Sequence, residues 1–481
     1  MNRRNFLVKN SLALGGLSML SSTAVANNIL FNDPKFVSKR PSVGKRTYVS
    51  KGVEDLIKEV KKSIADDEVS WMFENCYPNT LDTTVDYEVI DGRPDSFIIT
   101  GDIDAMWLRD STAQVWPYMA LVKSDKKIRD LIHGLVNRQV KCILKDPYAN
   151  AFYKDLSKES EWQSDDPTPI PGVHERKFEI DSLCYPIRLA NEYYETTKDT
   201  SIFDDEWDKA MRLVVKTFRT EQRKDGTTPY HFVRTTNRMA DAPLFGTGRP
   251  VKPVGLICSM FRPSDDATLY PFLIPSNIFA VLVLNHLAKI YDEVNSVKDA
   301  AFAKECKSFA NEVDAAIKEY AVLDHLDFGK IYAYEVDGYG NRVFMDDANV
   351  PSLMSLAYLG AHKPDDALYK RTRAYLLSDS NPYYMKGKAA EGQGSPHTGK
   401  RSIWPMGIIL RAFTSTDDQE IHHCIKMLKE THAGTGFMHE SFDKDDPENF
   451  SRSWFAWANT LFGELIIKVY HERPHLLKGT F

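Results

Sequence analysis

Residues Ile180 to Thr196 read IDSLCYPIRLANEYYET, and their apolar side chains recur along one face at helical spacing. The period is nearer 3.6 residues than 2, which predicts a helix and not a strand. The same period recurs in Val53–Ala65, Thr112–Leu121, Lys127–Leu144, Asp205–Glu221, Ser276–Val294, Asp299–Ala321, Pro351–Gly360, Asp365–Leu377, Ile403–Phe413, Asp417–Thr431 and Arg452–Glu472. About a dozen helices in sequential hairpins is the number in a closed double ring, so we expect an all-α fold with short connections. Only short strand-like pieces, Ser96–Thr100 and Lys330–Val336, interrupt the series.

The N-terminus has the features of a targeting segment. Arg3 and Arg4 precede a moderately apolar run, and Ala24-Val25-Ala26 is typical of a cleavage site. We therefore interpret residues 1–26 as a twin-arginine signal peptide, which predicts a periplasmic or otherwise exported protein. Residues 27–50 are polar and are predicted to be an extended lead-in. No low-complexity linker interrupts residues 51–481, so we interpret them as one catalytic domain.

Composition narrows the possible partners. The 481 residues are 43% hydrophobic and 27% charged, which is ordinary for a soluble globular protein. The net charge of −6 becomes −9 once Arg3, Arg4 and Lys9 leave with the signal segment. Without a basic block, the chain is a poor candidate for binding nucleic acid or an anionic membrane. The six cysteines are widely spaced, so zinc and iron–sulfur sites lack support and we expect buried free thiols.

A second stretch, Thr100 to Tyr118, reads TGDIDAMWLRDSTAQVWPY and holds three aspartates, one arginine and two tryptophans with no other charge. Carboxylates and a guanidinium can hydrogen-bond hydroxyl groups, and tryptophan faces can cover the apolar faces of a ring. The mixture is typical of a pocket for a neutral, polyhydroxylated ligand. The alternative is a helix start with aspartate caps and a structural ion pair between Arg109 and Asp110.

Six loops that precede helices are rich in acids, aromatic residues and glycine. They are Thr100–Arg109, His174–Asp181, Phe261–Asp266, Asp346–Ser352, Gly392–Trp404 and Gly434–Phe442. Alternate loops of a helical ring converge on one face, and helix N-termini there offer free N–H groups and partial positive charge. We expect a site for a polar ligand on that face.

The segment Phe261–Thr268 carries two adjacent acids, Asp265 and Asp266. Ser264 is predicted to cap a helix that has both acids in its first turn. Adjacent acids allow one carboxyl to be ionised and its neighbour protonated. The alternative is that they only complement the helix dipole.

The segment Gly434–Phe442 carries a single acid, Glu440, among aromatic and glycine residues that favour an inward-facing loop. Two carboxylates from distant parts of a chain are what glycoside hydrolysis requires: one protonates the leaving oxygen, and the other activates water or attacks the sugar. Sequence spacing does not choose between inversion and retention.

Competing motifs are absent or weak. The chain has no Walker A, HExxH or GxSxG pattern. Asp102-Ile103-Asp104 resembles the metal-binding D-x-D of sugar-nucleotide transferases, but no α/β pattern surrounds it. His422-His423-Cys424 lies in a periodic helix and is interpreted as surface or core. We therefore predict no metal and no cofactor.

Five motifs, taken in order, resemble glycoside hydrolase family 125. They are GDIDAMWLRDS (101–111), EIDSLCYP (179–186), FRPSDDA (261–267), SPHTGKRSIWPM (395–406) and GTGFMHESF (434–442). The likeness covers roughly residues 45–475. It implies an (α/α)6 barrel with short β-hairpins in its loops. It also implies an exo-acting α-1,6-mannosidase that removes terminal mannose from α-mannan or N-glycan fragments, with inversion and without a catalytic metal.

The resemblance also implies roles for individual residues. Asp265 matches the general acid, with Asp266 as the fallback, and Glu440 matches the general base. Further sugar contacts are implied at Asp102, Asp104, Trp107, Arg109, Asp110, Arg262, His397, Trp404 and His439, with Asp181 and Tyr185 as additional lining. We expect burial and neighbouring negative charge to keep Asp265 protonated, and inversion predicts carboxyl groups roughly 6.5–9.5 Å apart.

Two other classes remain open at this stage. A non-catalytic glycan-binding protein would use the tryptophan and arginine contacts without paired acids. A sugar epimerase or polysaccharide lyase could use a similar helical barrel, although a lyase would favour a basic groove for uronic acids. The oligomeric state is not predicted.

Overall fold

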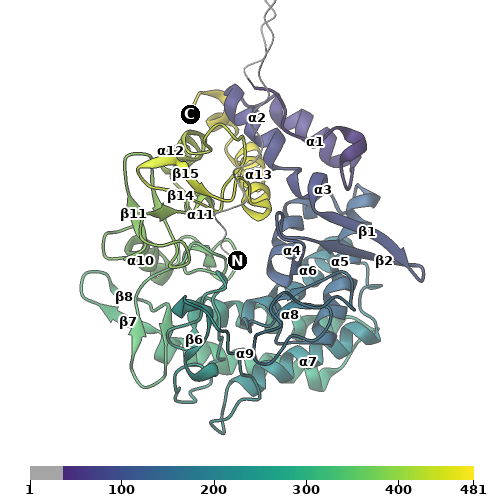
Figure 1. Cartoon of the computed structure of the whole chain (residues 1–481), viewed down its shortest axis with the longest axis vertical. Coiled ribbons are helices and arrows are strands. Elements are labelled where there is room, and N and C mark those ends of the chain that lie inside the picture. Colours follow the sequence, from purple (N-terminus) through teal and green to yellow (C-terminus); the bar gives the residue numbers. More distant parts are fainter. Residues whose placement is uncertain (1–35) are drawn as a thin grey trace, which may run out of the picture. The chain divides into compact units, whose positions relative to one another are not determined.

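Helices form most of the regular structure in residues 36–481, the part of the chain that the computed structural model describes (Figure 1). They are α1 (Lys51–Lys61), α2 (Asp67–Cys76), α3 (Asn79–Thr83), α4 (Leu108–Val115), α5 (Lys126–Lys145), α6 (Ile180–Thr197), α7 (Asp205–Glu221), α8 (Ile274–Glu293), α9 (Ala300–Tyr320), α10 (Ala367–Leu376), α11 (Pro405–Phe413), α12 (Asp418–Glu430) and α13 (Ala456–Glu472). A mostly helical fold is confirmed. The predicted signal peptide lies outside the described residues.

Short strands fill the connections between the helices. They are β1 (Val85–Ile90), β2 (Arg93–Ile98), β3 (Met106–Trp107), β4 (Ala151–Phe152), β5 (Val173–Glu175), β6 (Phe272–Leu273), β7 (Val322–His325), β8 (Gly329–Tyr332), β9 (Glu335–Val336), β10 (Arg342–Val343), β11 (Tyr384–Lys386), β12 (Glu391–Gln393), β13 (Ser402–Ile403), β14 (Ser441–Asp443) and β15 (Asp446–Ser451). Three sheets have three strands each, in the orders β3-β4-β5, β10-β9-β6 and β13-β14-β15, and all their pairings are antiparallel. Strands of these sheets lead directly into α4, α8 and α11.

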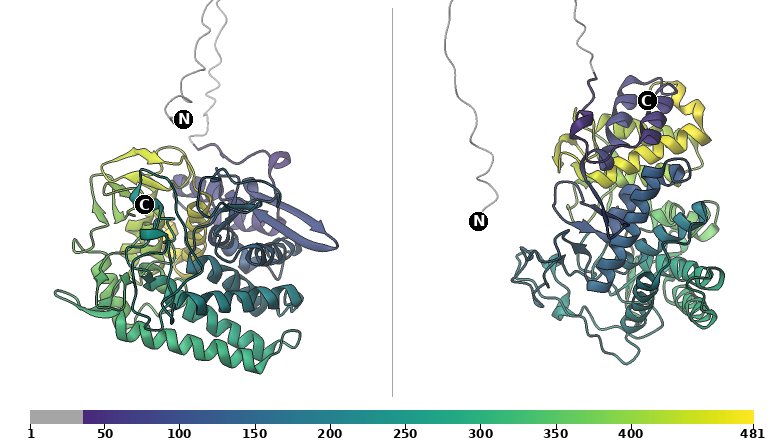
Figure 2. Two further views of the ribbon diagram at one scale, coloured as in Figure 1. Left: turned by 60° about the horizontal axis from the view of Figure 1, so that its bottom comes forward. Right: turned by 90° about the vertical axis from the view of Figure 1, so that its right-hand side faces the viewer.

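The unit Ser38–Phe481 runs through one circuit, from α1 through α4, α8 and α11 back to α13 (Figures 1 and 2). Along this circuit α4 packs on α6, α6 on α8, α11 on α13, and α13 on α4. The short 3-10 helix η5 (Met354–Leu356) contacts both α8 and α11. Ala65 N donates to Leu477 O at 2.8 Å, and Lys429 Nζ lies 2.6 Å from Asp66 Oδ2, so the two ends of the circuit are joined.

Two classes of helix differ in how they begin. Side-chain N-caps occur on α1, α2, α5, α7, α9, α10 and α12, at Ser50, Asp66, Asp125, Asp204, Asp299, Asp366 and Asp417. The helices α4, α6, α8, α11 and α13 begin after Trp107, Glu179, Leu273, Trp404 and Phe455, none of which makes a side-chain cap hydrogen bond. Other segments of the chain hold these starts instead: Ile274 N donates to Tyr334 O at 2.9 Å, and Ile180 N donates to Ser259 Oγ at 3.1 Å. The second class is therefore fixed by tertiary contacts, which leaves its N-terminal side chains available for a site.

Three predicted helices differ from the structure. The predicted helix Thr112–Leu121 is divided between the end of α4 at Val115 and the 3-10 helix η2 (Trp116–Leu121). Pro351–Gly360 contains only η5, because the Asp346 carboxylate accepts the N–H groups of Leu353 and Met354 at 2.9 and 3.0 Å and holds the chain in a tight turn. The helix predicted from Arg452 begins only at Ala456. A strand, β15, ends at Ser451, and Arg452 follows it with φ 50°.

The short segment before α1 packs into the fold as well. Arg40 makes ion pairs with Glu54 and with Asp82, whose Oδ2 is 2.7 Å from Arg40 Nε. All six cysteines are buried free thiols, as predicted. The helix α8 is long and apolar enough to cross a membrane, but 67% of its apolar window is buried inside the fold, as expected of a core helix.

Candidate active site

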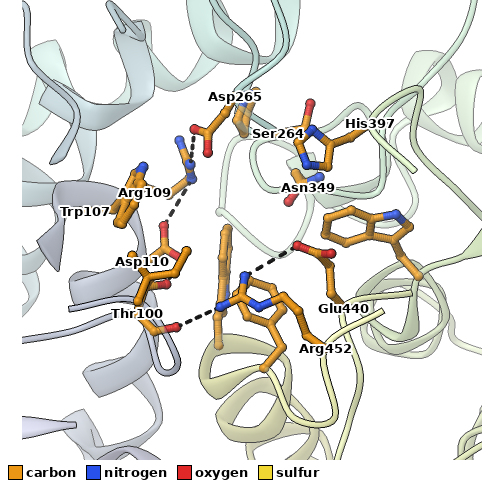
Figure 3. Close-up of a pocket in the computed structure, with 15 residues that line it drawn as sticks. Thr100, Trp107, Arg109, Asp110, Ser264, Asp265, Asn349, His397, Glu440 and Arg452 are labelled. Atoms are coloured by element: carbon orange, nitrogen blue, oxygen red, sulfur yellow. Dashed lines mark hydrogen bonds and ion pairs between the residues drawn. The ribbon is translucent and has the colours of Figure 1, made fainter. Parts of the chain in front are cut away.

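A pocket of about 400 Å³ lies among the loops that precede α4, α8, α11 and α13 (Figure 3). It is lined by Thr100, Ile103, Trp107, Arg109, Asp110, Pro263, Ser264, Asp265, Asn349, His397, Trp404, Glu440, Arg452, Phe455 and Trp457. Five of the six loops singled out in the sequence contribute to this lining. The sixth, His174–Asp181, supplies Glu179 and Asp181, which contact Arg109.

The structure brings seven of the predicted site residues into this one pocket: Asp265, Glu440, Trp107, Arg109, Asp110, His397 and Trp404. Asp265 and Glu440 lie across the pocket from each other (Figure 3). Sequence reasoning missed Asn349, Arg452, Phe455 and Trp457 as site residues. The last three lie in the segment that was interpreted as a regular helix from residue 452.

Asp265 sits in a tight turn and not in the first turn of a helix, so the predicted Ser264 cap is wrong. Phe261 and Ala267 form an isolated antiparallel bridge, and Asp265 N donates to Arg262 O at 2.9 Å. Asp265 has φ 65°, a left-handed conformation that aspartate tolerates better than most side chains. The Ser264 hydroxyl donates to Asp347 Oδ2 at 2.9 Å. The turn projects Asp265 into the pocket, where its side chain is 27% exposed.

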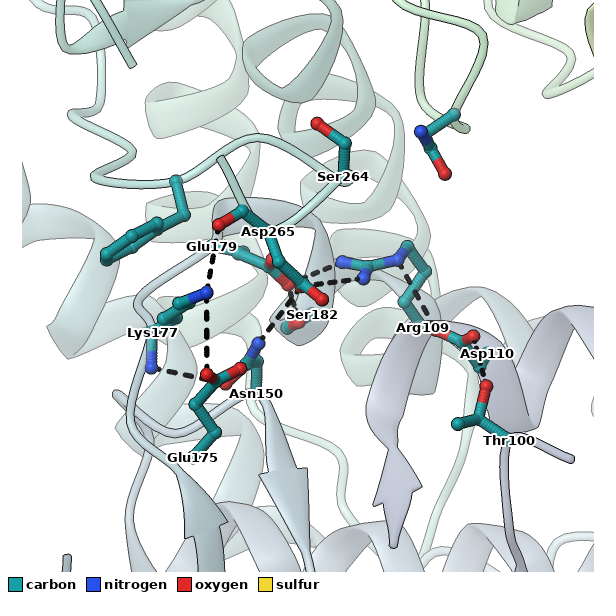
Figure 4. A network of polar contacts seen from close by, with 12 residues as sticks. Thr100, Arg109, Asp110, Asn150, Glu175, Lys177, Glu179, Ser182, Ser264 and Asp265 are labelled. Atoms are coloured by element: carbon teal, nitrogen blue, oxygen red, sulfur yellow. Dashed lines mark hydrogen bonds and ion pairs between the residues drawn. The ribbon is translucent and has the colours of Figure 1, made fainter. Parts of the chain in front are cut away.

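One guanidinium organises the acids on this wall. Arg109, in the first turn of α4, places Nη1 2.5 Å from Glu179 Oε2 (Figure 4). It also places this nitrogen 3.3 Å from Asp181 Oδ2. Its Nη2 is 3.2 Å from Asp265 Oδ1, and its Nε is 3.4 Å from Asp110 Oδ2. Four carboxyl groups from three segments of the chain therefore share one buried cation.

The charges on this wall contradict the expectation that Asp265 is protonated. Burial favours the neutral form of Asp265, but Arg109 and Lys177 outweigh it and lower the pKa of its carboxyl to about 2. Burial instead raises the pKa of Glu179 well above its usual range, against the attraction of Arg109. The N-terminus of α6 would stabilise the ionised form of Glu179 by about 0.3–1 kcal/mol. Burying a polar atom without a partner costs about 1–3 kcal/mol, so the helix terminus does not offset the burial.

Glu440 is held on the opposite wall by two donors. Ser451 Oγ donates to its Oε2 at 3.0 Å, and Arg452 Nη1 lies 3.4 Å from its Oε1. Both partners donate, which suits a carboxylate that only accepts. The loop that carries Glu440 requires Gly436, which has φ 73° and would bring any Cβ within 2.6 Å of the Trp71 ring.

The two candidate acids of the SDDA motif have different surroundings. Asp266 is 1% exposed and does not line the pocket. Its Oδ1 accepts from Arg238 Nη2 at 2.7 Å and lies 2.9 Å from His397 Nδ1. Burial acts to lower the pKa of His397, but the hydrogen bond and charge of Asp266 outweigh it and raise that pKa overall. The geometry thus favours Asp265 as the acid that reaches a ligand and gives Asp266 the task of holding His397.

Six predicted contacts lie outside the pocket lining: Asp102, Asp104, Arg262, His439, Asp181 and Tyr185. Asp102 pairs with Arg452, and Asp104 Oδ2 lies 3.1 Å from Lys158 Nζ. The D-x-D carboxylates therefore face separate cations and not a shared metal position. Among the described residues, no group of three or more His, Cys, Asp or Glu side chains is arranged to hold a metal ion.

The other four support the lining from behind. Arg262 Nε is 2.7 Å from Glu335 Oε1, below the turn that carries Asp265. His439 stacks on Phe450 with ring centroids 3.8 Å apart. Tyr185 donates to Val350 O at 3.0 Å and packs against the ring of Trp457, which does line the pocket. Asp181 reaches the site only through Arg109.

Comparison with known proteins agrees with this geometry. Residues 66–467 match the family described as metal-independent alpha-mannosidase, GH125. The chain belongs to this family. It is therefore a glycoside hydrolase, which sets aside the binding-protein, epimerase and lyase alternatives.

Individual relatives support the assignment. The chain is 42% identical, over 92% of its length and 90% of the relative's, to the meiotically up-regulated gene 157 protein of Schizosaccharomyces pombe. It is 41% identical to a Streptococcus pneumoniae metal-independent α-mannosidase solved as a non-productive substrate complex with α-1,6-mannobiose. That structure gives a TM-score of 0.84 over 89% of this chain and 100% of the other. A bacterial glucoamylase bound to acarbose shares the fold alone, with 12% identity and a TM-score of 0.51 over 89% of this chain and 58% of the other.

Proposed function

We propose that this family member removes non-reducing terminal mannose from α-1,6-linked oligosaccharides, such as α-mannan or N-glycan fragments, with inversion. The observation that carries the proposal is the placement of Asp265 and Glu440 on opposite walls of one pocket (Figure 3). Glycoside hydrolysis requires such a pair, one carboxyl on each side of the scissile bond. The α-1,6-mannobiose bound by the Streptococcus pneumoniae relative supports the linkage.

Each carboxyl takes one role in this proposal. Asp265 protonates the glycosidic oxygen as its bond to the anomeric carbon breaks. Glu440, held by Ser451 and Arg452, takes a proton from the water that attacks the opposite face of the sugar. Proton transfer by positioned carboxyls contributes typically about 10²–10⁴-fold to a rate.

The pocket lining supports action at a chain end. Arg109 and Asp110 are positioned to hydrogen-bond hydroxyls of the terminal ring, and such charge-assisted bonds are stronger than neutral ones. A sugar with a differently oriented hydroxyl would leave these buried groups unpaired, which penalises its binding.

Proton NMR of the purified protein with α-1,6-mannobiose, sampled early, tests the proposal. We expect β-mannose to be released first, and Asp265→Asn and Glu440→Gln to abolish turnover while the protein stays folded. Early release of α-mannose would show that the enzyme retains the anomeric configuration and does not invert it. Release only from other linkages would remove the α-1,6 specificity, and full activity in both variants would refute the assignment of the acids.

We further infer an (α/α)6 barrel and export through the twin-arginine route. The serial packing of α4, α6 and α8, and of α11, α13 and α4, with η5 between α8 and α11, supports the barrel. Arg3 and Arg4 with the Ala24–Ala26 cleavage pattern support export. N-terminal sequencing of protein recovered from the periplasm tests the second inference, with Asn27 expected as the first residue.

A further inference from the structure

The carboxyl groups around Arg109 carry more negative charge than their cations balance. Arg109 alone lies within 3.4 Å of the carboxyls of Glu179, Asp265 and Asp110 (Figure 4). It also lies 3.3 Å from Asp181 Oδ2. Lys177 lies 3.4 Å from Glu175 and donates to the backbone oxygen of Asp265, so it does not pair with Glu179 or Asp181. In so buried a cluster at least one carboxyl must hold a proton.

The hydrogen bonds of the cluster favour Glu179 as the protonated member, because the other buried oxygen without a hydrogen bond, Asp110 Oδ2, still lies 3.4 Å from Arg109 Nε. Its Oε2 accepts from Arg109 Nη1 at 2.5 Å and from Ser182 Oγ at 2.7 Å. Its Oε1 is buried and has no hydrogen-bond donor among the described residues. That oxygen is satisfied only if it carries a proton itself. The carboxyl of Asp265, which shares Arg109 with Glu179 and whose negative charge raises the pKa of Glu179, is the neighbouring acceptor for that proton.

Asp265 is the better carrier of the negative charge in this pair. It accepts from Arg109 Nη2 at 3.2 Å and from Asn150 Nδ2 at 3.4 Å, and it faces the ammonium group of Lys177. Its side chain is 27% exposed to the pocket, whereas that of Glu179 is fully buried. The charged and titratable groups that face the pair are Arg109 and Asp110 of α4, His174 and Glu175 of β5, Lys177 after β5, Asp181 of α6, and His397 before β13.

We propose that Glu179 holds the proton of this pair in the resting enzyme and passes it to Asp265 as the glycosidic bond breaks. The inference rests on the proposed function, in which Asp265 protonates the leaving oxygen. Glu179 acts through Asp265, without contact to the sugar, and is a positioning residue that stores the proton.

The proton balance closes with one water per bond cleaved. The O–H bond of Glu179 breaks as one forms on Asp265. Asp265 then gives its proton to the glycosidic oxygen, which keeps the electron pair of the broken bond to carbon. The attacking water loses a proton to Glu440, and exchange with solvent returns one proton from Glu440 to the Glu179–Asp265 pair.

The test compares two substrates that differ in their need for an acid. α-1,6-Mannobiose needs its leaving oxygen protonated, whereas 2,4-dinitrophenyl α-mannoside does not. We expect Glu179→Gln to lower kcat/KM about 100-fold on the disaccharide, to move the basic limb of its pH profile to lower pH, and to leave the aryl substrate within about threefold of wild type.

Asp181→Asn is the matched control, because Asp181 shares Arg109 with Glu179 but its other oxygen accepts from Ser276. It is expected to change the rates on the two substrates by the same factor. If Glu179→Gln also lowers both rates equally, or keeps the wild-type basic limb, Glu179 only supports the structure and the proposal is wrong.

A second measurement detects the proton on the Glu179 carboxyl without any turnover of substrate. The infrared difference between wild type and Glu179→Gln at pH 7 should contain a protonated-carboxyl band, and the difference for Asp265→Asn should lack it. Absence of the band in the Glu179→Gln difference overturns the proposal, whatever the activity. If the wild type cleaves neither substrate while the band is present, the proposed function fails and the assignment of the proton stands.

Discussion

Arg109 Nη2 lies 3.2 Å from Asp265 Oδ1, which ties the first turn of α4 to the loop before α8. The same guanidinium reaches Glu179, the residue before α6, with its other terminal nitrogen. One side chain thus fixes the relative positions of three segments that are far apart in the sequence. This explains why an arginine, with a planar fork of donors, occupies the position.

Substitutions of Arg109 test whether activity requires the planar set of guanidinium donors or only a positive charge. Arg109→Lys keeps a cation but cannot reach three carboxylates at once, so we expect kcat/KM to fall by about 100-fold or more. Arg109→Ala leaves buried acids without a cation, which costs about 3–5 kcal/mol of folding stability. Steady-state kinetics and urea unfolding measure the two effects. Wild-type kinetics in Arg109→Lys would show that charge alone suffices.

The bridge from Asp102 to Arg452 revises the role predicted for Asp102. Arg452 lines the pocket and reaches Glu440, whereas Asp102 lies outside the lining and pairs with Arg452. We therefore expect Arg452→Gln to lower kcat/KM by about 100-fold and Asp102→Asn by only about tenfold, because charge-assisted bonds to buried groups contribute more than exposed pairs. Kinetics on one disaccharide substrate measure both. Equal losses would place Asp102 on the sugar.

Loop composition predicted which segments form the site, because acids and aromatic residues with glycine rarely combine on an ordinary surface. The six loops singled out in the sequence all contribute to the pocket or to the Arg109 cluster. The same signal could not separate Asp265 from Asp266, since the choice depends on a turn with φ 65° at Asp265 that no local pattern marks. Nor could it identify Glu179, whose partners come from other segments.

Helical periodicity predicted most helices but obscured part of the site. Residues 452–472 share one apolar face, so the whole segment is predicted to be one helix, and Arg452, Phe455 and Trp457 are not singled out as site residues. In the structure β15 pairs with β14, and this sheet contact holds residues 452–455 outside the helix. A tertiary pairing of this kind overrides local periodicity and leaves no mark in a single sequence.

Substitutions at the N-cap residues of the helices that have side-chain caps should lower stability without loss of activity. Asp417 is exposed, and its carboxylate accepts from Gln419 N at 2.8 Å at the start of α12. We expect Asp417→Ala to lower the free energy of unfolding by about 1 kcal/mol and to leave kcat unchanged. Asp417→Asn, which keeps the cap, is the matched control. A large effect of Asp417→Asn would mean that the charge, and not the cap, stabilises the helix.

Glu464 on α13 should make stability fall as the pH rises. It accepts from the Tyr358 hydroxyl at 2.9 Å, and burial raises the pKa of its carboxyl from 4.5 to about 7. Between these two values the folded state binds more protons than the unfolded state, so the free energy of unfolding decreases with increasing pH in that window. Below pH 4.5 both states are protonated and the stability is fully present.

The variant Glu464→Gln removes this titration while keeping the size and the hydrogen-bond acceptor of the side chain. We expect its urea unfolding midpoint to be close to that of the wild type at pH 5 and higher at pH 8, because only the wild type must then bury a charge. Glu192→Gln is the control, because it removes another acid that lines the same pocket as Glu464, Tyr358 and Arg188. Parallel profiles for wild type and Glu464→Gln from pH 5 to 8 would show that Glu464 is ionised throughout, with Arg188 balancing its charge.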